Sequence, residues 1–195
     1  MKAVVALLCV GWLLGPGAIC RAELLAGIGR AEISEKSVPQ NDPLYVKALV
    51  LKQGDEIAVL ITVDAVSIGG IGHIPDTWLP EVRQTLQQTL GIPPLSVFAN
   101  ASHCHGVVGR DVGERTVEAV TTAWKSLQPV RAGAGIGQEV RIMENRRLQL
   151  ADGSEADVRR AYSMPWDDEV TGIGPVDPEI GLLQLNRMDG TPLAV

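Results

Sequence analysis

Two histidines, His103 and His105, have the residue type and spacing best suited to chemistry in this sequence. They follow residues 97–101, which are β-branched, aromatic or small and come after a Gly-Ile-Pro-Pro break, and this pattern predicts a short buried strand. Loops that leave the carboxyl ends of strands in open α/β sheets line the crevice where ligands bind. On an extended backbone both imidazoles point to the same side, because side chains alternate with a period of two. The pattern suits a metal ligand with a second polar group beside it; the alternative is two structural histidines at a strand end.

The segment around these histidines resembles a signature of the neutral/alkaline ceramidase family, a group of secreted zinc-dependent amidases. The family pattern is Ser/Thr-His-Thr-His-Ser-Gly/Ala-Pro, and the matching residues here are Asn100-Ala101-Ser102-His103-Cys104-His105-Gly106. Weaker matches follow the family's order at residues 26–33, 42–51, 144–147 and 176–185. The chain departs from the pattern at Cys104, which replaces Thr, and at residues 106–108, where Gly-Val-Val replaces Ser-Gly-Pro. The resemblance covers nearly all of the chain after residue 23.

The resemblance implies a zinc-dependent amidohydrolase that cleaves the N-acyl amide bond of ceramide-like lipids. It makes His103 a Zn²⁺ ligand, His105 a catalytic group that stabilises the oxyanion or moves a proton, and Arg146 a catalytic positive charge beside the zinc. A catalytic zinc normally has three protein ligands and a water. In the family the other ligands come later in the chain, so we expect residues 23–195 to be an incomplete, N-terminal part of a larger catalytic domain.

Two alternatives to this enzyme are compatible with the sequence. The first is a non-catalytic secreted α/β domain, or an inactive remnant of the family, that keeps the fold and has lost the metal. The second is a thiol enzyme that uses Cys104 with His105. It is weaker, because adjacent residues on a strand point apart and cannot pair as nucleophile and base.

Residues 1–22 have the pattern of a signal peptide. Lys2 is followed by an apolar run, a Gly-Pro-Gly break and a small-residue cleavage site, for which we favour the bond after Ala22. The run is too short to span a bilayer comfortably. Lipidation of Cys20 is the second interpretation of this segment, and a buried helix is disfavoured by the Gly-Pro-Gly break. The sequence therefore predicts an exported protein, periplasmic or secreted.

The charge and cysteine content constrain partners and redox chemistry. Removal of Lys2 and Arg21 with the signal peptide takes the formal net charge from −6 to −8. An acidic chain without a basic stripe argues against nucleic acid as a partner. Cys104 is the one thiol left after cleavage, so no internal disulfide is expected. The expected partner is a small-molecule or lipid amide substrate, and peripheral contact with membrane lipid is compatible with the sequence. The sequence does not indicate the oligomeric state.

The hydrophobic pattern predicts an α/β fold with a mixed sheet and covering helices. Residues 45–51 and 57–63 read as a hairpin whose second strand, apolar at almost every position, should be covered on both faces. That strand ends at Asp64, either a cap for the following loop or a residue near the metal. A helix is expected to begin within residues 75–80 and to end at Gly91, and a second helix is expected over residues 114–127. A helix between two strands implies a parallel pair.

The last third of the chain reads mainly as strands. The Gly-x-Gly-x-Gly of residues 133–137 predicts a glycine-rich strand rather than a phosphate-binding loop, because no amphipathic helix follows. Residues 145–150 should form a strand on which Arg146 and Arg147 face opposite ways. Both could be plain surface arginines, and the resemblance favours Arg146 as the inward one. A long loop over residues 159–175 and a final hairpin of residues 182–186 and 192–195 complete the expectation.

Overall fold

A computed structural model describes residues 22–158 and 164–195 of the chain. The predicted signal peptide therefore lies outside the described residues, apart from Ala22, and export remains a prediction. Within the described part, no helix has the length and apolar character needed to cross a membrane.

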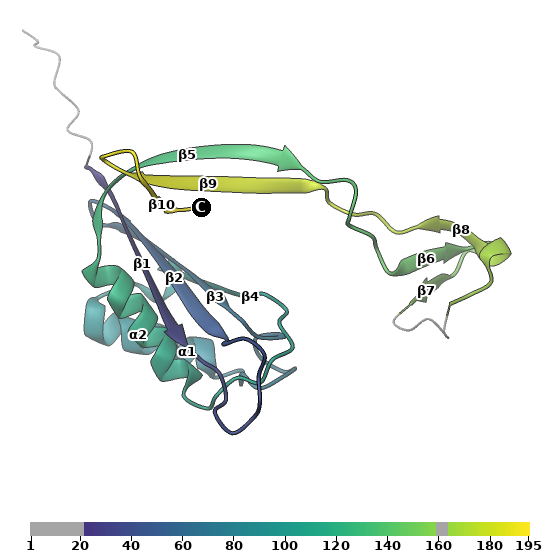
Figure 1. The fold of residues 1–195 in the computed structure, drawn as a ribbon, viewed down its shortest axis with the longest axis horizontal. Helices are drawn as coiled ribbons and strands as arrows, with labels where there is room; N and C mark the ends of the chain where they lie inside the picture. The colour runs from purple at the N-terminus through teal and green to yellow at the C-terminus, as the bar shows by residue number, and fades with distance from the viewer. Residues whose placement is uncertain (1–21, 159–163) are drawn as a thin grey trace, which may run out of the picture.

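Ten strands and two α-helices make up the described fold (Figure 1). The strands are β1 (Leu24–Glu32), β2 (Tyr45–Gln53), β3 (Glu56–Val63), β4 (Val97–Ala101), β5 (Gln128–Gln138), β6 (Arg147–Leu150), β7 (Glu155–Asp157), β8 (Val170–Ile173), β9 (Glu179–Arg187) and β10 (Pro192–Ala194). The helices are α1 (Trp78–Leu90) and α2 (Val112–Lys125), with short 3-10 turns at Pro94–Ser96 and Asp167–Glu169. Strand order is β10-β9-β5-β1-β2-β3-β4 in one sheet and β7-β6-β8 in another.

The mixed α/β fold predicted from the sequence is confirmed. Strands β2 and β3 form the expected hairpin about Gly54, whose φ of 60° suits a tight turn. Helix α1 ends at Gly91, which has φ 69° and donates its N–H to Gln87 O at 3.1 Å. The chain then returns as β4, which pairs with β3 in parallel. This crossover brings the carboxyl ends of β3 and β4 to the same edge of the sheet.

One face of strands β1–β4 carries the main core, and α1 and α2 cover it. Side chains alternate along β3, so that Val59, Ile61 and Val63 are buried against the helices. Helix α2 approaches β1 closely, because two glycines of the strand face it. A Cβ atom added at Gly27 or Gly29 would collide with backbone carbonyl oxygens of α2.

The opposite face is only partly covered in the described chain. The prediction that residues 57–63 are covered on both faces is therefore wrong: Leu60 remains 42% exposed. Leu60 lies level with Ile28, Leu49 and Phe98 across the four strands. Further along the same face, β9 and β10 bring Leu185 and Leu193 onto Ala26. The apolar run at residues 57–63 thus has one face that is covered by the helices and one face that is partly exposed. Periodicity alone does not distinguish such a strand from one that is covered on both faces.

Strands β5 and β9 form a long antiparallel ribbon that leads away from the helical layer to the three-stranded sheet (Figure 1). The expected strand at residues 131–137 and the final hairpin are thereby confirmed. The predicted loop at 159–175 is wrong in its described part. Strand β8 pairs there with β6, and a 3-10 turn precedes it. Its Thr-Gly-Ile pattern is too short to show strand periodicity by itself.

Candidate functional site

The candidate site forms where β3 and β4 end side by side. The two strands are in register up to Val63 and Ala101. Beyond them, Ser102 N–H donates to Val63 O and Cys104 N–H donates to Ala65 O, each at 3.0 Å. This backbone ladder holds the two exit segments together and places both histidines at the carboxyl edge of a parallel pair, as the sequence predicted.

His103 does not lie on an extended strand, contrary to the expectation. Strand β4 ends at Ala101, and His103 has φ 61°, in the left-handed region that non-glycine residues rarely adopt. Its Nδ1 lies 2.8 Å from the carbonyl oxygen of Val66. A carbonyl oxygen only accepts hydrogen bonds, so the contact assigns the proton of the neutral ring to Nδ1. Nε2 then keeps its lone pair, which is the form that ligates a metal.

His105 is brought next to His103 in spite of the turn. The two ring centroids are 4.9 Å apart and the rings are nearly perpendicular, with an interplanar angle of 83°. Both side chains are exposed. The structure therefore confirms that the pair shares one place, although the reason is a turn at His103 rather than alternation along a strand.

Cys104 packs into the layer behind the site, as predicted for a residue between the two histidines. It is half-buried, packs against the main hydrophobic core and is a free thiol. This arrangement gives no geometry for a nucleophile–base pair with His105.

Asp64 bonds the strands on either side of β3. Its Oδ2 accepts the N–H of Tyr45 at 3.0 Å and lies 3.6 Å from Lys47 Nζ. Its Oδ1 accepts the hydroxyl of Ser102 at 3.2 Å. The carboxylate thus bridges β2 to the residue that precedes His103.

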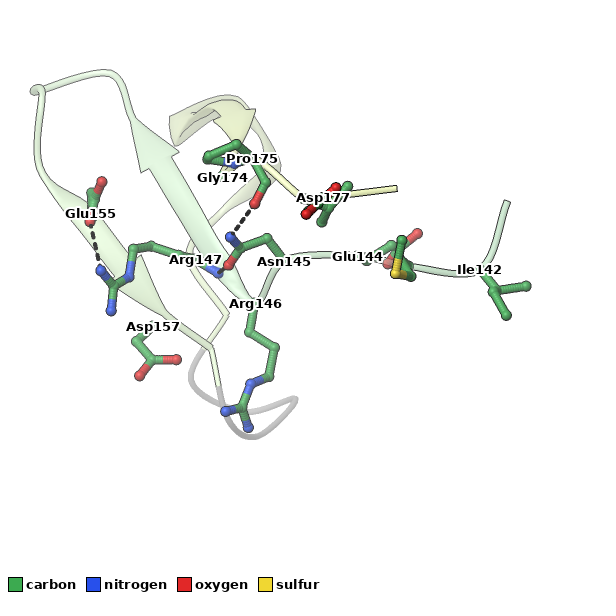
Figure 2. Close-up of a pocket in the computed structure, with 12 residues that line it drawn as sticks. Ile142, Glu144, Asn145, Arg146, Arg147, Glu155, Asp157, Gly174, Pro175 and Asp177 are labelled. Atoms are coloured by element: carbon green, nitrogen blue, oxygen red, sulfur yellow. Dashed lines mark hydrogen bonds and ion pairs between the residues drawn. The ribbon is translucent and has the colours of Figure 1, made fainter. Parts of the chain in front are cut away.

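Arg146 lies in a different part of the molecule from the histidines. It directly precedes β6 in the three-stranded sheet, which stands at the far end of the β5–β9 ribbon from β4 (Figure 1). A hollow of about 980 Å³ is lined there by both arginines, Asn145 and Asp157, among others. Figure 2 shows Arg147 directed toward Glu155, 3.6 Å away, and Arg146 directed elsewhere. The two arginines diverge as predicted, but the structure does not bring Arg146 to His103.

Two solved structures share the fold of this chain. A neutral ceramidase from Pseudomonas aeruginosa superposes with a TM-score of 0.60 at 14% sequence identity. A structure described as a ceramidase complexed with C2 gives a TM-score of 0.59 at 16% identity. The chain has the fold of part of a neutral ceramidase. It aligns over 88% of its own length and spans 30% of each of those chains.

Sequence comparisons add no assignment to this ceramidase fold. No protein-family model matches the chain, and no curated protein does. The likeness to ceramidases thus rests on the arrangement of strands and helices. The choice of candidate site residues rests on the geometry around the ends of β3 and β4.

The side chains at the ends of β3 and β4 can supply one ligand to a metal ion, but they do not form a complete coordination shell. His103 presents Nε2, and Val66 O fixes the other ring nitrogen, as is usual for metal-binding histidines. In residues 22–158 and 164–195, no three His, Cys, Asp or Glu side chains gather closely enough to hold a metal ion. His103 therefore fits as a single donor, with His105 beside it.

Two parts of the site were not predicted from the sequence. The Val66 carbonyl carries no residue-type signal, because any residue could supply it. The bond between Asp64 and Ser102 had a partial signal, since a carboxylate at the exit of a buried strand was singled out as either a cap or a site residue. Its partner could be named only once β3 and β4 were known to be parallel and in register.

Proposed function

We propose that this chain contributes to a zinc-dependent amidohydrolase of the neutral ceramidase type, acting on the N-acyl amide bond of ceramide-like lipids. The observation that carries the proposal is the contact between His103 Nδ1 and Val66 O. It leaves Nε2 free at the carboxyl edge of a parallel strand pair, in a chain with the fold of part of a neutral ceramidase.

In this proposal His103 binds the metal through Nε2, held in the required tautomer by Val66. When bound, zinc lowers the pKa of a coordinated water and polarises the amide carbonyl. His105, in ring contact with His103, donates a hydrogen bond to the developing oxyanion or moves the proton to the leaving amine. The described residues gather no group of three His, Cys, Asp or Glu side chains, so the proposal requires further metal ligands from outside them. The role of Arg146 beside the oxyanion stays a prediction, since the structure places it directly before β6 of the separate three-stranded sheet.

The other parts of the proposal follow from the sequence. The apolar N-terminal segment and its cleavage pattern support export, and an acidic exported chain is compatible with a lipid or small-molecule amide as its partner.

The experiment is an amidase assay on protein made from the full open reading frame that contains residues 23–195. We expect hydrolysis of short-chain fluorescent ceramides that is lost on chelation and restored by Zn²⁺. His105→Ala should lower kcat by about 10²–10⁴-fold, the usual contribution of a general acid or base. The matched control is His73→Ala, which removes an exposed loop histidine and should leave kcat close to the wild-type value.

Two results would contradict the proposed function. One is the absence of chelator-sensitive hydrolysis across a panel of N-acyl amides. The other is a His105→Ala protein with undiminished turnover.

A further inference from the structure

The Asp64 carboxylate engages its two neighbouring strands at the point where the chain leaves the sheet. It accepts the backbone N–H of Tyr45 on one side and the Ser102 hydroxyl on the other, while the Asp64 N–H donates to Tyr45 O at 2.9 Å. The side chain is 18% exposed, so it is largely out of water. A mostly buried carboxylate with two hydrogen-bond donors is fixed in place.

The contact between His103 and Val66 starts one residue after Ser102 and two residues after Asp64. The distance between His103 Nδ1 and Val66 O depends on how the segments that follow β3 and β4 lie relative to each other. His103 also has a left-handed backbone, a conformation that persists only where the surroundings hold it. The Asp64–Ser102 bond joins the two segments directly before that residue.

We propose that Asp64 is a positioning residue: through Ser102 it holds the His103 ring on the Val66 carbonyl, so that Nε2 is the nitrogen presented to a metal. The proposal rests on the proposed function only in naming a metal as the ligand of Nε2. The link from Asp64 to the tautomer of His103 is a property of this chain by itself.

A second side-chain hydrogen bond between β3 and β4 provides a control that distinguishes positioning of His103 from general stabilisation of the strand pair. Thr62 Oγ1 donates to Asn100 Oδ1 at 3.1 Å, which is also a side-chain bond between β3 and β4. It lies two residues before the Asp64–Ser102 bond on each strand and does not lead into the turn. Loss of either bond removes one hydrogen bond between the strands, but only the loss of the Asp64–Ser102 bond should affect His103.

The test is ¹H–¹⁵N NMR of the histidine rings in the 195-residue chain, with long-range correlations that report which nitrogen carries the proton. We expect His103 in the wild-type chain to be protonated on Nδ1. Asp64→Ala and Ser102→Ala should each shift His103 toward protonation of Nε2, whereas Asn100→Ala should not. Ser102→Ala keeps the Tyr45 bond, so it remains informative if Asp64→Ala fails to fold.

Asp64→Asn should rescue the tautomer. The amide oxygen can accept from Tyr45 N–H while the amide nitrogen donates to Ser102 Oγ, so the bridge survives without its charge. In the metal-loaded protein from the full reading frame, Asp64→Ala should lower zinc affinity about 10–100-fold, as loss of groups that orient a ligand commonly does.

The outcomes separate this proposal from the function on which it builds. An Asp64→Ala chain and a Ser102→Ala chain that both keep His103 protonated on Nδ1 would overturn the positioning role. A wild-type His103 protonated on Nε2 would instead remove the geometric support for metal binding. An equal change in Asn100→Ala would reduce the effect to general loosening of the strands and also overturn the proposal.

Discussion

Two neighbouring residues of β3, Leu60 and Ile61, differ in solvent exposure and should therefore contribute unequally to the free energy of unfolding. Ile61 is 1% exposed and packs under the helices, whereas Leu60 is 42% exposed on the other face. Both are apolar, so their sequence types give no hint of the difference. The packing of the described chain therefore predicts different energetic roles for two residues that look alike in sequence.

Substitution of each residue by alanine in residues 23–195 should show this difference. Ile61→Ala removes buried methyl groups and leaves a cavity, which should lower the free energy of unfolding by about 2–5 kcal/mol. Leu60→Ala removes a partly solvated side chain and should cost less than about 1 kcal/mol. Urea denaturation of the two variants measures both values. Equal, large losses would mean that the second face is covered by something the described fold does not contain.

Among the elements, α2 and β1 depend on each other through Gly27 and Gly29. Neither glycine has a positive φ, so the backbone conformation does not require them. What requires them is the closeness of α2, whose backbone carbonyl oxygens of Ala119 and Ala123 lie where a Cβ would stand. The Ala-Gly-Ile-Gly stretch of the first strand thus has a packing reason.

Alanine at Gly27 should push α2 off the sheet. We expect a loss of about 1–3 kcal/mol in the free energy of unfolding, the usual cost of overpacking. Gly133→Ala is the control, because Gly133 also lies in a strand and has open space around its Cβ position. Its effect should stay within about 1 kcal/mol of zero. Comparable midpoints of chemical denaturation for both variants would show that α2 does not pack on β1 in this way.

Elements set by local patterns were predictable, and elements set by distant partners were not. The β2–β3 hairpin, α1 and α2 follow from side-chain periodicity, and the hairpin turn and the end of α1 are also marked by Gly54 and Gly91. Strand β8 exists because it pairs with β6, more than fifteen residues away in the chain, and no local signal reports that.

The same division holds at the candidate site. The His103–His105 pair and the strand that leads to it could be found by spacing. The left-handed turn at His103 could not, because it is held by Val66 O and by the exits of β3 and β4. The place of Arg146 was equally out of reach, since it depends on the course of the β5–β9 ribbon rather than on the residues around it.

At the scale of the whole molecule, the described chain is a helix-covered sheet joined by a ribbon to a small second sheet (Figure 1). The histidines lie at the edge of the first sheet, on the strand pair β3 and β4. The chain spans 30% of the ceramidases whose fold it shares. In the proposed function, His103 is the residue by which this part of the fold holds the ion, because the described residues gather no three His, Cys, Asp or Glu side chains into a complete metal site.

Zinc content of His103→Ala and His105→Ala tests that claim most directly. Protein from the full reading frame would be loaded with zinc, dialysed and subjected to metal analysis, alongside wild-type protein and the His73→Ala control. The wild-type, control and His105→Ala proteins should retain zinc, because His105 acts on the transition state rather than on the metal. His103→Ala should lose it. Zinc retained at one ion per chain by His103→Ala would contradict the account.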